Sequence, residues 1–489
     1  MIMKLHELTI VEAHNALVHK DISTVELVTA CIARIYSIDN RINAFITILD
    51  EEALAQAHTI DAKIAAGEKI GMLTGIPYSA KDVIMTEGVR TTAGSNMLRE
   101  FIPPFNATVI EHLNQAGAIL IGKTNCDAYG HGSSTENSDF FVTRNPHDTT
   151  RVAGGSSGGA AAAVALGMGL FALGEDTGGS IRQPASFCGI TGLKVSYGRV
   201  SRYGIIAYAS SLDTVGPLTK NAEDCAIVLS AIAGRDNRDH TTVHETPTDY
   251  YAAIKKKDMH GLRIGIPVEY FTKDLDREVN NIVMEAVRKL KVQGCVIEEV
   301  SLPLTSVAIP TYYSIAASET SANLARLDGI RFGHRTTLAQ STEEVFKQSR
   351  MEGLGAEAQR RIMLGTYALS AGYHDEYYKK AQKVRTLLRK EFESAFKKVD
   401  VLICPTSPFT AFRIGEKSAN PAEMYLADIY TTAFSLAGLP TINVPCGYIS
   451  DLPVGMQIAG PYTDEMTVLQ VAAAFEQVTD WHKKRPSIS

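Results

Sequence analysis

The sequence predicts an α/β fold in which one large mixed β-sheet is covered by helices on both faces. Three observations predict it. Apolar residues recur at helical spacing within the first 70 residues, strands and helices alternate from about residue 75, and a helix–glycine–strand pattern returns at 277–303. Alternation of this kind is typical of a large sheet with helices packed on both of its sides.

Each predicted element has its own local signal. Ser23 and Glu26 have the spacing of a capping box, which predicts the start of a helix. Gly117 ends the helical pattern of 107–117. Short apolar runs rich in β-branched residues predict strands. The expected strands are 76–84, 118–123, 399–408 and 439–447, and a closing helix is expected at 465–478.

The same patterns suggest how the chain is organised. No internal repeat or low-complexity linker divides the 489 residues, so we predict a single domain over 1–489. Within it we expect a mainly helical N-terminal segment at 1–70, a core at 75–235, and a helical cap or insertion at about 320–398.

Composition limits the class of protein. Hydrophobic residues make up 45% of the chain and charged residues 21%, which is typical of a globular protein. The 48 lysines and arginines stand against 54 acidic residues, a formal net charge of −6. This balance argues against a protein that binds nucleic acid unaided. We interpret basic runs such as 379–390 as solvated helix faces.

Neither a membrane anchor nor a metal site is expected. The N-terminus lacks the apolar segment of a secretory signal. A long uncharged run, 154–174, has the length of a membrane span, but its glycines favour a buried helix followed by a strand. The seven cysteines are odd in number and form no metal-binding pattern, which favours free, mostly buried thiols in a reducing compartment.

One motif suggests a nucleotide site and is rejected. Residues 117–124 read GAILIGKT, which has the spacing of a phosphate-binding loop. Its four central residues favour an extended strand, and the turn-rich sequence that follows does not start a helix. We therefore predict a strand, with Lys123 capping its end.

The stretch DTGGS at 176–180 carries candidate chemistry. Gly178 and Gly179 can turn consecutive backbone N–H groups towards one point, and such a nest binds an anion, including the oxyanion formed when a hydroxyl attacks a carbonyl. Ser180 would then lie beside that oxyanion hole. The alternative is a tight turn with a surface serine.

A nucleophilic serine needs a base, and no histidine is placed by sequence to serve Ser180. Lys81 lies in an otherwise apolar predicted strand, and serine–lysine variants of the catalytic triad exist. A lysine has an unperturbed pKa of about 10.4, so it accepts a proton near pH 7 only where burial lowers that value. The alternative for Lys81 is a strand-end charge paired with Asp82.

Taken together, three stretches resemble the amidase signature family: GIPYSAKD around Lys81, GGSSGG at 154–159, and DTGGSIRQPASFCGITGLK at 176–194. The resemblance implies the amidase signature fold. It also implies that Ser180 is the nucleophile, that Ser156 on a cis peptide relays protons, and that Lys81 is the buried base. The backbone N–H groups of Thr177, Gly178, Gly179 and Ser180 would form the oxyanion hole.

Further stretches lie along the whole chain, among them GKTNCDAYGHGSSTENS at 122–138 and MYLADIYTTAFSLAGLPTINVPCG at 424–447. They resemble one branch of that family, the glutamine-hydrolysing subunits of tRNA-dependent amidotransferases. The resemblance implies partner subunits B and C, ammonia passed to a partner that amidates mischarged tRNA, and a cytoplasmic location. ATP and Mg would be used by the partner, with no cofactor in this chain. The alternative is a stand-alone amidase that acts on small aryl or alkyl amides.

The substrate would impose its own requirements. Free glutamine carries an α-carboxylate and an α-ammonium, so its pocket needs a cation and an anion. By resemblance, Arg361 binds the carboxylate, with Arg360 as the alternative, and Asp428 binds the ammonium with Tyr312 nearby. Without the resemblance, each charge would be interpreted as part of a surface ion pair. His131 is expected near the pocket mouth, in a packing role.

Overall fold

A computed structural model describes residues 4–245, 248–255, 258–273, 275–418 and 420–488. Among these residues, eleven strands form one sheet in the order β1-β3-β2-β4-β6-β5-β10-β11-β9-β7-β8. Strand β2 pairs in parallel with β3 and β4, and β7 with β8 and β9, while the other neighbours are antiparallel. The predicted mixed sheet is confirmed. The strands are β1 (Phe45–Ile48), β2 (Pro77–Lys81), β3 (Ile119–Thr124), β4 (Phe171–Asp176), β5 (Thr191–Lys194), β6 (Thr214–Thr219), β7 (Arg263–Pro267), β8 (Val296–Val300), β9 (Val401–Pro405), β10 (Thr441–Ile449) and β11 (Leu452–Ala459).

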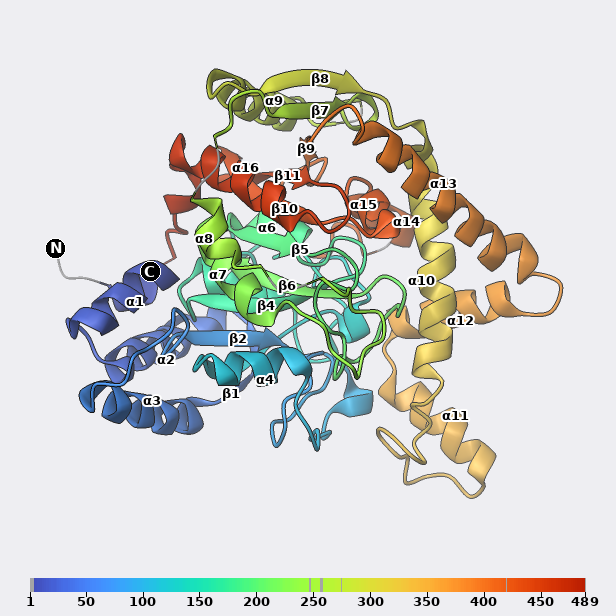
Figure 1. The fold of residues 1–489 in the computed structure, drawn as a ribbon. Helices are drawn as coiled ribbons and strands as arrows, with labels where there is room; N and C mark the ends of the chain where they lie inside the picture. The colour runs from blue at the N-terminus through green and yellow to red at the C-terminus, as the bar shows by residue number, and fades with distance from the viewer. Residues whose placement is uncertain (1–3, 246–247, 256–257, 274, 419, 489) are drawn as a thin grey trace.

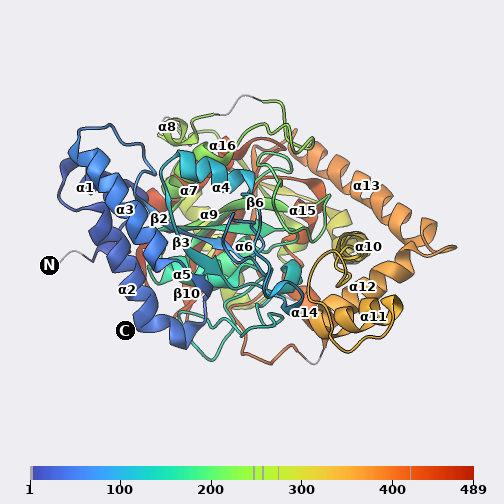
Figure 2. The same cartoon turned by 90° about the horizontal axis from the view of Figure 1, so that it is seen from below.

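Helices cover both faces of the sheet (Figures 1 and 2). In Figure 2, α7 and α16 lie on one side of the strands, and α2 and α5 on the other. Both views place α1–α3 at the opposite end of the molecule from α10–α13. The α-helices are α1 (Ile10–His19), α2 (Thr24–Ile42), α3 (Asp50–Ala65), α4 (Thr108–Gln115), α5 (Gly158–Ala165), α6 (Arg182–Cys188), α7 (Ala222–Ile232), α8 (Tyr250–Ile254), α9 (Arg277–Val292), α10 (Ala308–Leu324), α11 (Thr342–Gly353), α12 (Ala356–Leu369), α13 (Lys380–Ala395), α14 (Pro421–Tyr425), α15 (Thr432–Ala437) and α16 (Glu465–Gln477).

The local signals in the sequence mark real element ends. The Ser23 hydroxyl accepts the backbone N–H of Glu26, and the Glu26 carboxylate accepts the backbone N–H of Ser23, so the capping box starts α2 as predicted. Helix α4 ends at Gln115, and Gly117 follows with a φ of +78°. Glycine adopts this left-handed conformation without the steric cost that other residues incur.

The motif that resembles a phosphate-binding loop is strand β3. Lys123 is fully buried on it, and its ammonium group donates to the Ile84 carbonyl at 2.6 Å and to the Thr91 hydroxyl at 2.8 Å. Asp82 lies 3.5 Å from the same nitrogen. The strand is confirmed, whereas the expectation that Lys123 only caps its end is wrong, because the side chain is part of a buried polar cluster.

The long uncharged run folds as helix α5, a short connection and strand β4. No helix within the described residues is both long enough and apolar enough to cross a bilayer. The cysteines are free, as predicted, and all seven are buried, where the prediction was that most would be.

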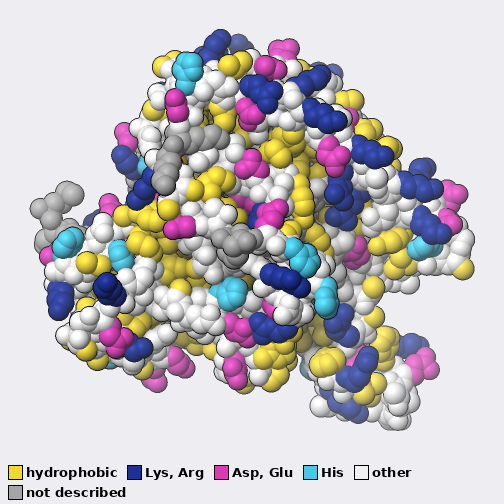
Figure 3. All heavy atoms as spheres, viewed as in Figure 1, with side chains coloured by type: hydrophobic (Ala, Val, Ile, Leu, Met, Phe, Trp, Pro, Cys, Tyr) yellow, Lys and Arg dark blue, Asp and Glu magenta, His cyan; other side chains and the backbone are white. Residues whose placement is uncertain are grey.

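A helical layer stands at one end of the sheet. The layer comprises α10–α13, so it starts at Ala308, before the predicted boundary at 320. One cluster of buried apolar side chains runs from Leu8 to Phe475 and includes residues of this layer. On the face shown in Figure 3, acidic and basic side chains are interspersed.

Candidate active site

The site forms where two parallel strands end. Lys81 is the last residue of β2, and β2 pairs with both β3 and β4. Glu175 lies near the end of β4, which is parallel to β2. Because the carboxyl ends of parallel strands meet at one edge of a sheet, the two side chains lie together, at the kind of edge where α/β proteins place their sites.

Lys81 has three hydrogen-bond partners and no exposure to solvent. Its Nζ lies 2.7 Å from Ser156 Oγ, 2.7 Å from Glu175 Oε2 and 3.1 Å from the Glu175 carbonyl oxygen. The structure thus brings Lys81 and Ser156 together, as the family resemblance implies. The alternative pairing of Lys81 with Asp82 is wrong, since successive side chains of an extended chain point to opposite faces and Asp82 faces Lys123.

Ser156 lies in the glycine-rich turn before α5. The Gly155–Ser156 peptide is cis, as the resemblance implies. The turn is fixed by the Gln183 side chain, which accepts the Gly155 N–H at 2.9 Å. The next residue, Ser157, donates its backbone N–H to the carbonyl of Ser180 at 3.1 Å. This bond joins the turn of Ser156 to the segment of Ser180.

Ser180 lies in the connection from β4 to α6. Asp176 fixes this connection, since its carboxylate accepts the Ile181 N–H at 3.0 Å and forms an ion pair with Arg182 at 3.0 Å. In the described part of the chain, the hydroxyl of Ser180 has no hydrogen-bond partner, and the backbone N–H groups of 177–180 donate to no acceptor. Free donors beside a free hydroxyl are what an oxyanion hole next to a nucleophile requires.

Arg361 projects from α12 into the interior. Its Nε donates to Glu357 at 2.8 Å, one terminal nitrogen to the Tyr208 hydroxyl at 2.5 Å, and the other to the Gly132 carbonyl at 2.8 Å. A guanidinium has five N–H donors, so these three bonds leave one donor on each terminal nitrogen. Arg360 instead has a side chain that is 44% exposed and pairs with Glu357 at the surface. Of the two arginines, Arg361 is the one within the site.

Asp428 and Tyr312 lie against the 177–180 loop. A β-carbon built on Gly179 would lie 3.3 Å from Asp428 Oδ1, and one built on Gly178 would lie 2.6 Å from Tyr312 Cζ. Asp428 is buried, and its Oδ1 has no partner among the described residues. Burial raises the pKa of Asp428 to about 7, with the Ser133 hydroxyl and Arg361 opposing the rise. An unpaired buried carboxylate oxygen is a ready acceptor for an ammonium group.

His131 is completely buried and not at a pocket mouth. Its Nε2 lies 2.9 Å from the Thr320 hydroxyl, and its ring meets the Tyr208 ring edge-on with centroids 4.8 Å apart. Burial, together with the Arg361 charge, lowers the pKa of His131 well below its ordinary value. The expected location is therefore wrong, while the packing against Tyr208 supports the expected packing role.

Two further residues of the site, Glu175 and Asp213, were not predicted from the sequence. Glu175 contacts Lys81 directly, and Thr177 bridges Glu175 to Asp213. A signal for Glu175 is present in the sequence, since an acidic residue stands next to Asp176 at the end of an apolar strand. Successive side chains of a strand point to opposite faces of the sheet, so Glu175 faces Lys81 and Asp176 faces Arg182.

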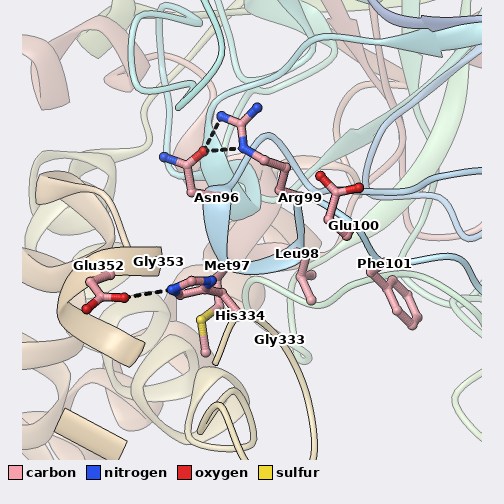
Figure 4. Close-up of a pocket in the computed structure, with 10 residues that line it drawn as sticks. All are labelled: Asn96, Met97, Leu98, Arg99, Glu100, Phe101, Gly333, His334, Glu352 and Gly353. Carbon is pink, nitrogen blue, oxygen red and sulfur yellow. Dashed lines mark hydrogen bonds and ion pairs between the residues drawn. The ribbon is translucent and has the colours of Figure 1, made fainter. Parts of the chain in front are cut away.

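A separate surface hollow of about 640 Å³ lies between the 96–101 segment and α11 (Figure 4). Figure 4 shows His334 directed at Glu352, with which it forms an ion pair of 2.7 Å, and Arg99 directed at Asn96. Apart from Glu100, the polar side chains of the hollow bind each other in these two pairs, and none of the predicted site residues lines it.

The fold and site define an amidase. The profile of the Amidase family matches residues 26–469, and the chain belongs to this amidase signature family. It is 52% identical over 486 residues to the A subunit of the glutamyl-tRNA(Gln) amidotransferase of Moorella thermoacetica, and the match covers 99% of each chain.

Solved structures give the same result. The A subunit of the glutamyl-tRNA(Gln) amidotransferase of Thermotoga maritima is 38% identical with a TM-score of 0.81, and the match covers 98% of this chain and 96% of that one. A bacterial aryl acylamidase of the amidase signature family is 26% identical with a TM-score of 0.86, covering 98% of each chain.

Proposed function

We propose that this chain is the glutamine-hydrolysing subunit of a tRNA-dependent amidotransferase. One observation carries the proposal: two unused donors of Arg361 and the unpaired Oδ1 of Asp428 lie in the same site as Ser180. A cation and an anion in one amide-cleaving site match the two charges of free glutamine. The names of the relatives support the same assignment.

The proposed reaction starts with attack of the Ser180 hydroxyl on the side-chain amide of glutamine. The proton of Ser180 passes to Ser156 and from there to Lys81, whose nitrogen is 2.7 Å from Ser156 Oγ. The free backbone N–H groups of the 177–180 loop stabilise the tetrahedral oxyanion. The relay then returns a proton to the leaving ammonia, and water hydrolyses the γ-glutamyl ester of Ser180.

The rest of the proposed assembly lies outside this chain. Subunits B and C complete the complex, and the ammonia passes to the partner that amidates Glu-tRNA(Gln), Asp-tRNA(Asn) or both. The partner uses ATP and Mg, and it makes most of the contacts to mischarged tRNA, which suits the net charge of −6 on this chain. Such a reaction takes place in the cytoplasm.

The test is ammonia release from glutamine, acetamide and a benzamide, measured with and without candidate subunits B and C. We expect selective release from glutamine, stimulation by the partners, and complete loss in Ser180→Ala. Turnover of the simple amides with glutamine left intact would contradict the proposal and favour the second candidate, a stand-alone amidase.

A further inference from the structure

The contacts of Lys81 are those of an ammonium group. Its nitrogen has three acceptors within 3.1 Å: Ser156 Oγ, Glu175 Oε2 and the Glu175 carbonyl oxygen. An ammonium has three hydrogens and no lone pair, so each acceptor takes one hydrogen. In this arrangement Lys81 cannot accept a proton from Ser156 until it has released one of its own.

Glu175 is the acceptor that can take that proton. Its carboxylate oxygen lies 2.7 Å from Lys81 Nζ, and neither side chain is exposed by more than 2%. A β-carbon built on Gly130 would lie 3.2 Å from this oxygen and 3.6 Å from Ser156 Oγ, so the chain closes over the pair. The other two acceptors cannot take the proton. Ser156 must itself give a proton to Lys81, and the backbone carbonyl of Glu175 is a far weaker base than a carboxylate.

A second contact links the Glu175 carboxylate to a neighbouring carboxyl group. The Thr177 hydroxyl lies 2.5 Å from Glu175 Oε1 and 2.8 Å from Asp213 Oδ1. A hydroxyl has one hydrogen, so one of these two contacts needs a hydrogen from the carboxyl group. Burial and the charge of Glu175 raise the pKa of Asp213 well above its ordinary value. Asp213 then donates to Thr177, and the Thr177 hydroxyl donates to Glu175 Oε1, which leaves Oε2 to accept from Lys81.

We propose that Glu175 is a positioning residue of glutamine hydrolysis that accepts the proton of Lys81 and thereby makes Lys81 available as a base. The inference rests on the proposed function and deepens it. One Nζ–H bond breaks as one Oε2–H bond forms, so the net charge of the pair is unchanged. Rotation about the Cε–Nζ bond turns the lone pair towards Ser156. Ser156 then gives its proton to Lys81 as it receives the proton of Ser180.

Three other titratable groups face the pair, and they determine the useful pH range. They are Cys126 and Asp127 after β3, and Asp213 before β6. Burial raises the pKa of the Cys126 thiol, and burial raises the pKa of Asp127 to about 7. Between about pH 7.5 and 9.5 Asp127 is therefore mostly ionised, and the raised pKa of Cys126 favours its protonated thiol. Titration of Asp213 is removed by the variant Asp213→Asn, whose amide also donates to Thr177.

The test is the pH profile of kcat at saturating glutamine in this range, for the full chain with its partners. In the wild type, the proton moves only within the pair, so kcat is expected to stay flat. In Glu175→Gln, Lys81 must lose its proton to solvent. We then expect kcat to be about 10²-fold lower at pH 7.5 and to rise with a slope approaching one. A merely structural role would lower kcat without changing the shape of the profile, and this result would overturn the proposal.

Two controls keep the comparison specific. Glu465 is a fully buried carboxylate paired with Arg199 away from the site, so Glu465→Gln makes the same chemical change elsewhere. Both Glu465→Gln and Asp213→Asn are expected to keep the flat profile. If thermal melting shows that Glu175→Gln does not fold, the wild type alone decides, because a rise of slope one in the wild type overturns the proposal.

Failure of the proposed function would be distinguishable from failure of this inference. If the wild type cleaves a small aryl amide but not glutamine, the assignment as a glutaminase fails. The same pH profiles are then recorded with the aryl amide, because acylation of Ser180 uses the same proton path. A flat wild-type profile with a sloping Glu175→Gln profile would still support the role of Glu175.

Discussion

Replacement of Arg361 by alanine tests the substrate pocket most directly. The two unused donors of Arg361 would bind both oxygens of the α-carboxylate of glutamine. Hydrogen bonds between charged groups contribute about 1.5–3 kcal/mol each. With allowance for imperfect geometry, we expect a loss of about 3 kcal/mol in transition-state binding, which corresponds to about 10²-fold in kcat/KM.

The assay compares glutamine with propionamide, which has a cleavable amide but no α-carboxylate. We expect Arg361→Ala to reduce kcat/KM for glutamine by about 10²-fold and for propionamide by less than about 3-fold. Arg360→Ala is the matched control, since Arg360 also pairs with Glu357 but lies at the surface. It should leave both substrates nearly unaffected.

An equal loss on both substrates would refute this reasoning. Arg361 also binds Tyr208 and the Gly132 carbonyl, so its removal could disturb the site as a whole. Loss of activity towards propionamide together with a lower melting temperature would show that Arg361 acts by holding the pocket wall. No loss on glutamine would show that the α-carboxylate binds elsewhere.

Three further predictions concern other parts of the site. Ser156→Ala removes the relay between nucleophile and base, so kcat should fall by about 10³-fold for every amide in an ammonia-release assay, and a loss confined to glutamine would contradict the relay. The Asp428 carboxylate has a pKa of about 7, so it loses the charge that binds the α-ammonium as the pH falls below that value. The KM for glutamine should therefore rise about tenfold per pH unit below pH 7, and the KM of Asp428→Asn should not change with pH in this range. Gly178→Ala would place a methyl group 2.6 Å from Tyr312 Cζ, so the free energy of unfolding measured in urea should fall by about 1–3 kcal/mol. The control is Gly71→Ala, whose added methyl group would have its nearest neighbour 3.7 Å away and should not destabilise the fold by this overpacking.

Local signals allowed much of the fold and part of the site to be predicted. The capping box at Ser23, the stop at Gly117 and the strand character of 118–123 depend on neighbouring residues, and each is present in the structure. The loops of Ser156 and Ser180 were recognisable for the same reason, since their glycines are contiguous in the sequence.

The ion pair at the base could not be predicted in this way. Lys81 and Glu175 are 94 positions apart, and they meet only because β2 and β4 are neighbours in the sheet. Strand order is decided by packing of the whole sheet and has no local signal. The alternative pairing of Lys81 with Asp82 can be excluded from the sequence, because strand geometry alone separates consecutive side chains.

Burial of every cysteine has a practical consequence for labelling experiments. All seven thiols are enclosed in the native fold, and burial raises the pKa of six of them, so thiol-directed dyes should not react with them until the chain unfolds. A single cysteine introduced at an exposed position, such as Lys347 on α11, can therefore carry a fluorophore or spin label without removal of any natural cysteine. Distances from that label to a partner protein would report assembly in an otherwise unaltered chain.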